Sequence, residues 1–118
     1  MAKILIVDDS EALVAMLSEI LKKEGFEVDA VFTKKEMIFY LLSSTPDLFL
    51  LDVRLSGDDG RKICRDLKAN SLYKNIPVIL LSGSHELLES FTDFNADATI
   101  EKPFDMNVIL EKINSLLQ

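Results

Sequence analysis

The sequence predicts an α/β fold: a doubly wound, five-stranded parallel sheet of the flavodoxin-like kind, with five helices on its two faces. Short apolar segments recur along the chain, as expected for strands buried in a parallel sheet. Segments with apolar residues at helical spacing separate them, and the two kinds alternate five times. The chain has 118 residues, 48% of them hydrophobic, which suits one domain with its own core. We therefore expect residues 1–118 to form a single domain.

The predicted strands differ in how much of each is apolar. Residues 3–7 and 48–51 are apolar apart from Lys3, which predicts burial on both faces. Residues 26–31 alternate for most of their length and are expected to form a half-exposed edge strand. The two remaining strands are expected at residues 77–81 and 98–100.

Capping and stop signals place the helices. Ser10 is suited to cap the first helix, and Gly25 to end it. Thr33, followed three residues later by a glutamate, has the form of a capping box. Asn95 is expected to end the fourth helix, and Asp105 to cap the fifth. The apolar residues at helical spacing are Leu13, Leu17, Ile20 and Leu21; Met37, Ile38, Leu41 and Leu42; Ile63, Cys64 and Leu67; Leu87, Leu88, Phe91 and Phe94; and Ile109, Ile113 and Leu116.

Composition excludes several classes of function. The net charge is −7 without a basic run, so direct binding to nucleic acid is not expected. A single cysteine, Cys64, and a single histidine, His85, exclude an internal disulfide, a multi-cysteine zinc site and a histidine-pair metal site. No apolar run approaches the length of a membrane span, and the N-terminus lacks a signal peptide. A cytoplasmic protein is therefore expected.

Polar side chains follow four of the predicted strands. Asp8 and Asp9 follow the first, Asp52 ends the third, and Ser82 and Lys102 follow the fourth and fifth. We expect the strand order 2-1-3-4-5, which makes the first and third strands neighbours at the point where ligands bind such sheets. Three carboxylates would then meet and need a compensating charge. A hard cation with oxygen ligands, Mg²⁺, suits them. Lys102 and Ser82 could complete a site for phosphoryl transfer.

Five segments match the pattern of one protein family in their order and spacing: Ile6-Val7-Asp8-Asp9-Ser10, Leu51-Asp52, Asp59-Gly60, Leu81-Ser82-Gly83 and Glu101-Lys102-Pro103-Phe104. With them, the chain resembles, end to end, the receiver domain of two-component response regulators. The resemblance implies that Asp52 accepts a phosphoryl group from a histidine kinase or a histidine phosphotransfer protein. It also implies that Asp9, Asp52 and the backbone carbonyl of Arg54 bind Mg²⁺, while Asp8 acts largely through water. Ser82 and Lys102 would contact the phosphoryl group, and a cis peptide before Pro103 is compatible with the motif.

Three positions depart from the family's pattern. Many members have proline where this chain has Ser56, and methionine where it has Asp58. Many have tyrosine or phenylalanine where it has Thr99, and that ring turns inward on activation. Without the ring, the family's usual aromatic switch is not expected here, whereas the phosphorylation chemistry does not depend on this position.

The leading functional prediction is a phosphorylation-dependent signalling switch that alters binding to a downstream partner and does not act on an external metabolite. One alternative is a flavodoxin-like FMN-binding protein, disfavoured because Asp8 and Asp9 would repel the flavin phosphate. Another is a scaffold of receiver fold without phosphorylation. The side chain of Arg54 either flanks the path of the attacking water, together with Ser84, or is simply solvated. The kinase, the target and the oligomeric state stay open, as does the choice between a stand-alone regulator and a receiver of a larger protein.

Overall fold

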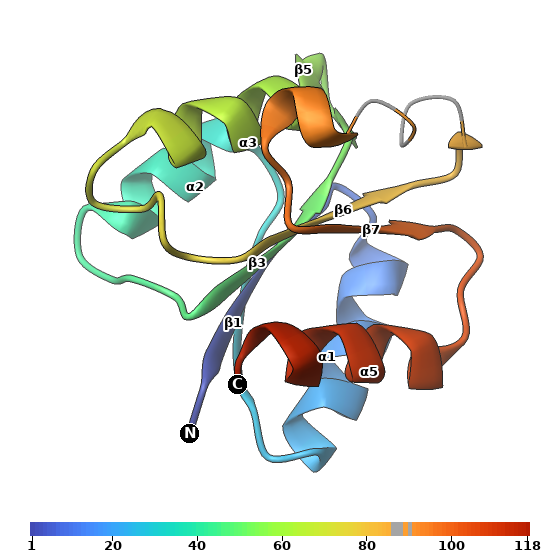
Figure 1. Cartoon of the computed structure of the whole chain (residues 1–118). Coiled ribbons are helices and arrows are strands. Elements are labelled where there is room, and N and C mark those ends of the chain that lie inside the picture. Colours follow the sequence, from blue (N-terminus) through green and yellow to red (C-terminus); the bar gives the residue numbers. More distant parts are fainter. Residues whose placement is uncertain (86–88, 90) are drawn as a thin grey trace.

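The computed structural model describes residues 1–85, 89 and 91–118, and its centre is a five-stranded parallel sheet (Figure 1). The strand order is β2-β1-β3-β6-β7, and every neighbouring pair is parallel. This order confirms the prediction, because β6 and β7 are the predicted fourth and fifth strands. The strands are β1 (Lys3–Val7), β2 (Glu27–Val31), β3 (Leu48–Asp52), β6 (Val78–Ser82) and β7 (Ala98–Glu101).

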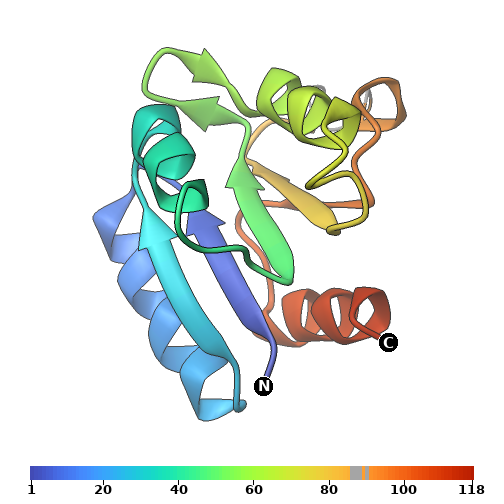
Figure 2. The same ribbon diagram turned by 90° about the vertical axis from the view of Figure 1, so that its left-hand side faces the viewer.

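Helices cover both faces of the sheet. Figures 1 and 2 show α1 (Glu11–Lys23) and α5 (Met106–Leu116) on one face, and α2 (Lys34–Leu41) and α3 (Gly60–Ala69) on the other. These are the four complete α-helices within the described residues. The predicted fourth helix falls largely on Glu86, Leu87, Leu88 and Ser90, which lie outside them. The apolar pair Phe91 and Phe94 begins and ends a short 3₁₀ helix, η1 (Phe91–Phe94).

The core has two halves, one on each side of the sheet. Leu5 and Val7 of β1 face the α2–α3 layer, whereas Ile4 and Ile6 face the α1–α5 layer. The predicted burial of both faces is confirmed for the central strands: every residue of β3 and β6 is buried. Cys64 of α3 is buried in the first half, as expected, and burial raises the pKa of its thiol to about 12.

The predicted helix ends agree with the structure in most cases. The hydroxyl of Ser10 accepts from the backbone N–H of Leu13, and Asp105 caps α5. Gly25 and Asn95 have φ of 95° and 62°, the left-handed conformation that ends a helix. The capping box at α2 is shifted, however. Thr33 caps as predicted, whereas the glutamate accepts from the N–H one residue before the cap.

The prediction for α2 is wrong in part. Met37 is buried, but Ile38 and Leu42 are 51% and 78% exposed, and Phe39 beside them is 75% exposed. This helix has only eight residues, so only one row of side chains, the one containing Met37 and the partly buried Leu41, packs into the core. The periodicity predicted a wider buried stripe than such a short helix contributes.

A small hairpin follows β3 where the sequence predicts only a turn-rich loop. Strands β4 (Arg54–Leu55) and β5 (Asp58–Asp59) pair antiparallel around a two-residue turn. Its residues, Ser56 and Gly57, have φ of 40° and 90°, and positive φ at both central positions defines a type I′ turn. Proline, with φ near −65°, cannot take the place of Ser56 in this turn.

No helix in the described part of the chain is long and apolar enough to cross a membrane.

Candidate functional site

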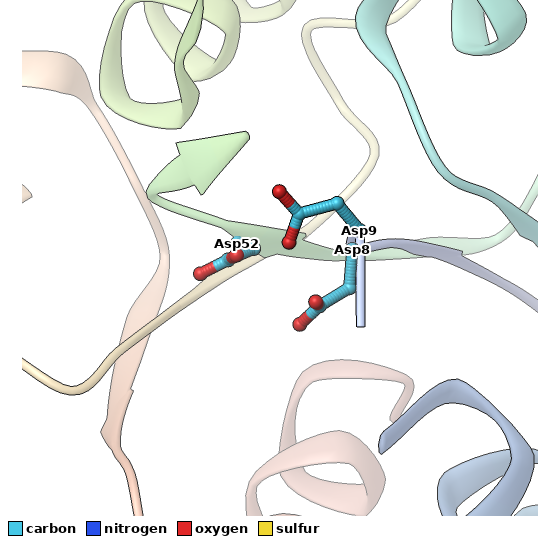
Figure 3. A group of neighbouring side chains, drawn as sticks. All are labelled: Asp8, Asp9 and Asp52. Atoms are coloured by element: carbon cyan, nitrogen blue, oxygen red, sulfur yellow. The ribbon is translucent and has the colours of Figure 1, made fainter. Parts of the chain in front are cut away.

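Three carboxylates meet at the carboxyl edge of the sheet. Asp8 and Asp9 follow β1, Asp52 ends β3, and one ligand oxygen from each lies within 4.8 Å of the others (Figure 3). The cause is the register of two neighbouring parallel strands, which pairs Val7 with Leu51 and so sets the next residues side by side. Asp8 is fully buried and Asp52 is 6% exposed, whereas Asp9 lies at the surface. The predicted meeting of the three carboxylates is therefore confirmed.

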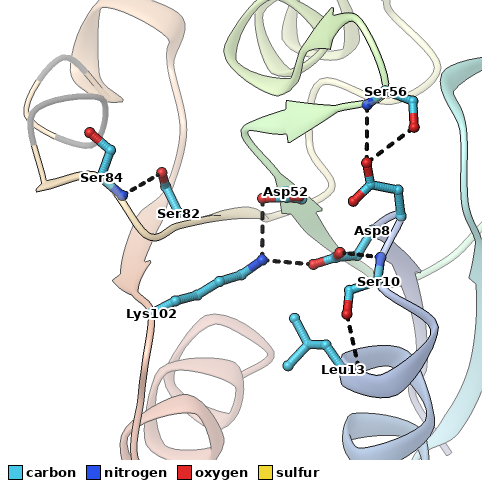
Figure 4. Close-up of polar contacts among 9 residues, drawn as sticks. Asp8, Ser10, Leu13, Asp52, Ser56, Ser82, Ser84 and Lys102 are labelled. Atoms are coloured by element: carbon cyan, nitrogen blue, oxygen red, sulfur yellow. Dashed lines mark hydrogen bonds and ion pairs between the residues drawn. The ribbon is translucent and has the colours of Figure 1, made fainter.

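A lysine bridges the two buried carboxylates. The Nζ of Lys102, just after β7, lies 3.0 Å from Oδ2 of Asp8 and 3.3 Å from Oδ1 of Asp52 (Figure 4). The backbone N–H of Lys102 donates to the carbonyl of Ser82, which holds this segment against β6, and the bond to Pro103 is cis. Within the described residues, this ammonium is the cation in direct contact with the pair.

Burial and charge act in opposite directions on Asp52. Removal from water raises the pKa of its carboxyl, and the negative charge of Asp8 raises it further. The ammonium of Lys102 and the backbone N–H of Arg54 lower it, but the net direction is upward. Asp52 is thus a carboxylate whose charge is under-compensated in the metal-free protein.

Ser82 ends β6, the neighbour of β3 on the side away from β1. Its side chain is nearly inaccessible, and its Oγ accepts a hydrogen bond from the backbone N–H of Ser84 at 3.0 Å (Figure 4). Because that bond uses the oxygen as acceptor, the hydroxyl hydrogen can be donated to another group. An open depression of about 540 Å³ lies at this edge. It is lined by Asp9, Asp52, Arg54, Ser82, Gly83, Ser84 and Lys102.

Two further residues support the site, and sequence reasoning missed one of them. The backbone N–H and the hydroxyl of Ser56 both donate to Oδ2 of Asp9. A Cβ on Gly60 would lie 2.0 Å from the backbone carbonyl oxygen of Asp52, so only glycine allows α3 to begin this close to β3. The Asp59-Gly60 motif pointed to the glycine, but no sequence signal pointed to a bond between Ser56 and Asp9.

The donor set fits a hard divalent cation. Carboxylate oxygens are the ligands that Mg²⁺ prefers, and three negative charges face one lysine ammonium. A divalent cation would offset the remaining charge. Arg54 lines the depression, and the role of its carbonyl as a ligand stays a prediction.

Comparison with known proteins identifies the family. The family model described as the response regulator receiver domain matches residues 4–114. The chain is 33% identical over 120 residues to the response regulator ArlR of Staphylococcus saprophyticus, a match covering the whole chain and 53% of that protein. The chain belongs to the response regulator receiver domain family. It spans about half the length of the curated relatives it matches.

Solved receiver domains have the same fold. The signal receiver domain of a histidine kinase from Syntrophus aciditrophicus is 32% identical, with a TM-score of 0.91, and the match covers 99% of this chain and 90% of that one. The response regulator TrrA of Thermotoga maritima, solved in complex with Mg²⁺ and beryllofluoride, is 28% identical with a TM-score of 0.89. That match covers 99% of this chain and 100% of TrrA.

The family assignment confirms the resemblance and the sheet architecture that the sequence predicts. As a receiver domain of this family, the chain is a regulatory phosphoacceptor module of two-component signalling. The cis bond between Lys102 and Pro103, compatible with the resemblance, is present. The single histidine, His85, is mostly exposed and lies near Glu89 and Glu101.

Proposed function

We propose that Asp52 of this receiver domain accepts a phosphoryl group from the phosphohistidine of a histidine kinase or a histidine phosphotransfer protein, with Mg²⁺ bound beside it. The observation that carries the proposal is the bridging of Asp8 and Asp52 by Lys102 within a three-carboxylate cluster. A phosphoacceptor must be ionised and accessible, and its surroundings must stabilise the oxygens of the incoming group. Asp52 borders an open depression that also contains a lysine and a buried serine hydroxyl.

The transfer step is a displacement at phosphorus. One oxygen of the Asp52 carboxylate forms the new P–O bond, while the P–N bond to the donor imidazole breaks and its electron pair leaves with that ring. The product is an acyl phosphate on Asp52. Bound Mg²⁺ would offset the negative charge on the phosphoryl oxygens. Asp9, Asp52 and the Arg54 carbonyl would hold the cation, and Asp8 would act largely through water.

Two side chains are suited to contact the phosphoryl oxygens. The ammonium of Lys102 has three donors and already contacts Oδ1 of Asp52, so it could move to a phosphoryl oxygen while keeping Asp8. The hydroxyl of Ser82, which lines the same depression, could donate to another phosphoryl oxygen. Charge-assisted hydrogen bonds of this kind are about twice as strong as neutral ones.

The proposed output is a change in the affinity of this domain for a downstream protein. We propose that the chain acts as one receiver domain, in the cytoplasm, and not as an enzyme on an external metabolite. Its catalysis would be limited to its own phosphorylation and slow dephosphorylation. Binding of FMN is disfavoured because two carboxylates after β1 would repel the flavin phosphate. A non-phosphorylated scaffold would not need Lys102 between two buried carboxylates.

Incubation with acetyl phosphate and Mg²⁺ tests the proposal. Intact-mass analysis should show one added phosphoryl group on the wild type, which hydroxylamine removes, because acyl phosphates are cleaved by that nucleophile. Asp52→Ala should show no addition. Asp58→Asn is the matched control, because this exposed aspartate lies in the neighbouring hairpin, and it should behave as the wild type. A phosphoryl group that persists in Asp52→Ala would place the acceptor elsewhere and reject the proposal.

A further inference from the structure

The turn of the hairpin β4–β5 contacts the carboxylate cluster through Ser56. Both donors of Ser56, the backbone N–H and the hydroxyl, bond to the same oxygen, Oδ2 of Asp9, at 3.2 and 3.1 Å (Figure 4). A carboxylate at the protein surface can usually exchange between rotamers, because water satisfies its oxygens in each of them. Two donors that converge on one oxygen favour a single orientation of Asp9.

The backbone of Ser56 is unusual for a non-glycine residue. Its φ of 40° lies in the left-handed region, which serine adopts rarely, and Gly57 at φ 90° completes the turn. In this conformation, the N–H and the side chain of Ser56 both reach Asp9. The same residue therefore has an unfavourable backbone conformation and two favourable contacts with a candidate metal ligand.

We infer that Ser56 is a positioning residue for the cation site: it holds Asp9 by Oδ2 and leaves Oδ1 to face the cation. The inference rests on the proposed Mg²⁺ site. Each carboxylate oxygen has two lone-pair directions, so the two Ser56 donors fully occupy Oδ2. One ligand oxygen of Asp9 lies within 4.8 Å of those of Asp8 and Asp52. A ligand oriented before binding loses less conformational freedom when the cation arrives, which increases affinity.

Titration of the purified protein with Mg²⁺ by calorimetry tests this role in two variants. Ser56→Ala removes the hydroxyl and keeps the N–H, and Ser56→Gly does the same while it suits the positive φ. Both variants should bind Mg²⁺ about tenfold more weakly than the wild type, as is typical when a partner of a metal ligand is removed. The metal-free Ser56→Gly protein should melt no lower than the wild type, because glycine relieves the backbone conformation. A loss of affinity without a loss of stability separates positioning from a structural role.

Ser71→Ala is the matched control, because Ser71 is an exposed serine in a turn after α3. The Mg²⁺ affinity of this variant should equal that of the wild type. Wild-type affinity in both Ser56 variants would overturn the inference and leave the Mg²⁺ site intact. Tighter binding in the variants would also overturn it, because the Ser56 donors would then compete with the cation. Absence of Mg²⁺ binding to the wild type would reject both this inference and the metal site of the proposed function.

Discussion

At the scale of single residues, Asp52 is buried and lies close to the negative charge of Asp8. Both effects raise the pKa of its carboxyl above the ordinary 3.8, and the ammonium of Lys102 offsets them only in part. In the metal-free protein, the native state therefore keeps the Asp52 proton at pH values where the unfolded chain has lost it. The free energy of unfolding falls as the pH rises from 3.8 through the raised pKa.

Asp52→Asn should therefore stabilise the metal-free protein at neutral pH. The amide removes one of two neighbouring negative charges and leaves Lys102 paired with Asp8, so we expect a gain on the order of 1 kcal/mol. Below pH 3.8, where the carboxyl is protonated in both states, the gain should disappear. Urea unfolding with a chelator, across a series of pH values, measures this difference. A variant less stable than the wild type at pH 7 would show that the Lys102 contact outweighs burial.

At the scale of the elements, α3 and α5 both begin at a capping aspartate, and within the described residues the one at α3 also forms an ion pair. Asp59 caps α3 through the N–H of Arg61, and its carboxylate also pairs with the guanidinium of Arg61 at 2.8 Å. That guanidinium lies over the ring of Phe94, 5.2 Å from its centre, and so connects α3 to η1. Phe94 itself is partly exposed and lies against the arginines of α3.

Asp59→Ala should cost about 1–2 kcal/mol of stability, because it removes both the cap and the ion pair. Asp105→Ala is the matched control: it removes the cap of α5, which forms no ion pair within the part of the chain that the structure describes, and it should cost less. Chemical denaturation measures both variants. Equal losses would mean that the pairing with Arg61 contributes nothing.

The charge of Asp59 also predicts a pH dependence. The hydrogen bonds from Arg61 lower the pKa of the Asp59 carboxyl, so the stabilisation is present above its ordinary value of 3.8 and is lost as the pH falls through the lowered pKa. Asp59→Asn keeps a capping oxygen without the charge. The stability difference between wild type and Asp59→Asn should thus be largest near neutral pH and shrink below 3.8.

At the scale of the whole molecule, β7 contacts both the carboxyl edge, where Lys102 follows it, and helix α5. Thr99 stands in this strand where many members of the family have an aromatic ring. Its backbone carbonyl accepts a hydrogen bond from the Lys112 ammonium of α5 at 2.5 Å. This contact joins the strand to the helix without involving the side chain of residue 99. Threonine is small, is branched at Cβ and has few rotamers, so its side chain cannot make the large inward movement that the ring makes.

We therefore expect weak coupling between Asp52 and α5. Beryllofluoride with Mg²⁺ should shift backbone amide resonances mainly near Asp9, Asp52, Ser82 and Lys102, with small changes along Met106–Leu116. Thr99→Tyr should enlarge the α5 changes, whereas the ring-free control Thr99→Val should not. Changes along α5 as large as those at the site in the wild type would show strong coupling without a ring.

Much of the architecture could be predicted because burial in a parallel sheet imposes a local pattern. Strands apolar on both faces, such as residues 48–51, must lie between two layers of helices, and polar residues that end such strands must gather at one edge. Asp8, Asp9, Asp52, Ser82 and Lys102 could be proposed together on this basis. The buried Met37 and the capping role of Ser10 followed from equally local rules.

Contacts between distant segments were decided only by the tertiary structure. Nothing near Ser56 in sequence shows that both of its donors meet Asp9, 47 residues away, or that its turn requires a positive φ. The exposure of Ile38 and Leu42 depends on how little of the eight-residue α2 reaches the core, which periodicity does not encode. Hydrophobic patterning specifies which residues leave water, whereas the partner of each polar group depends on the distances between whole elements after they have packed.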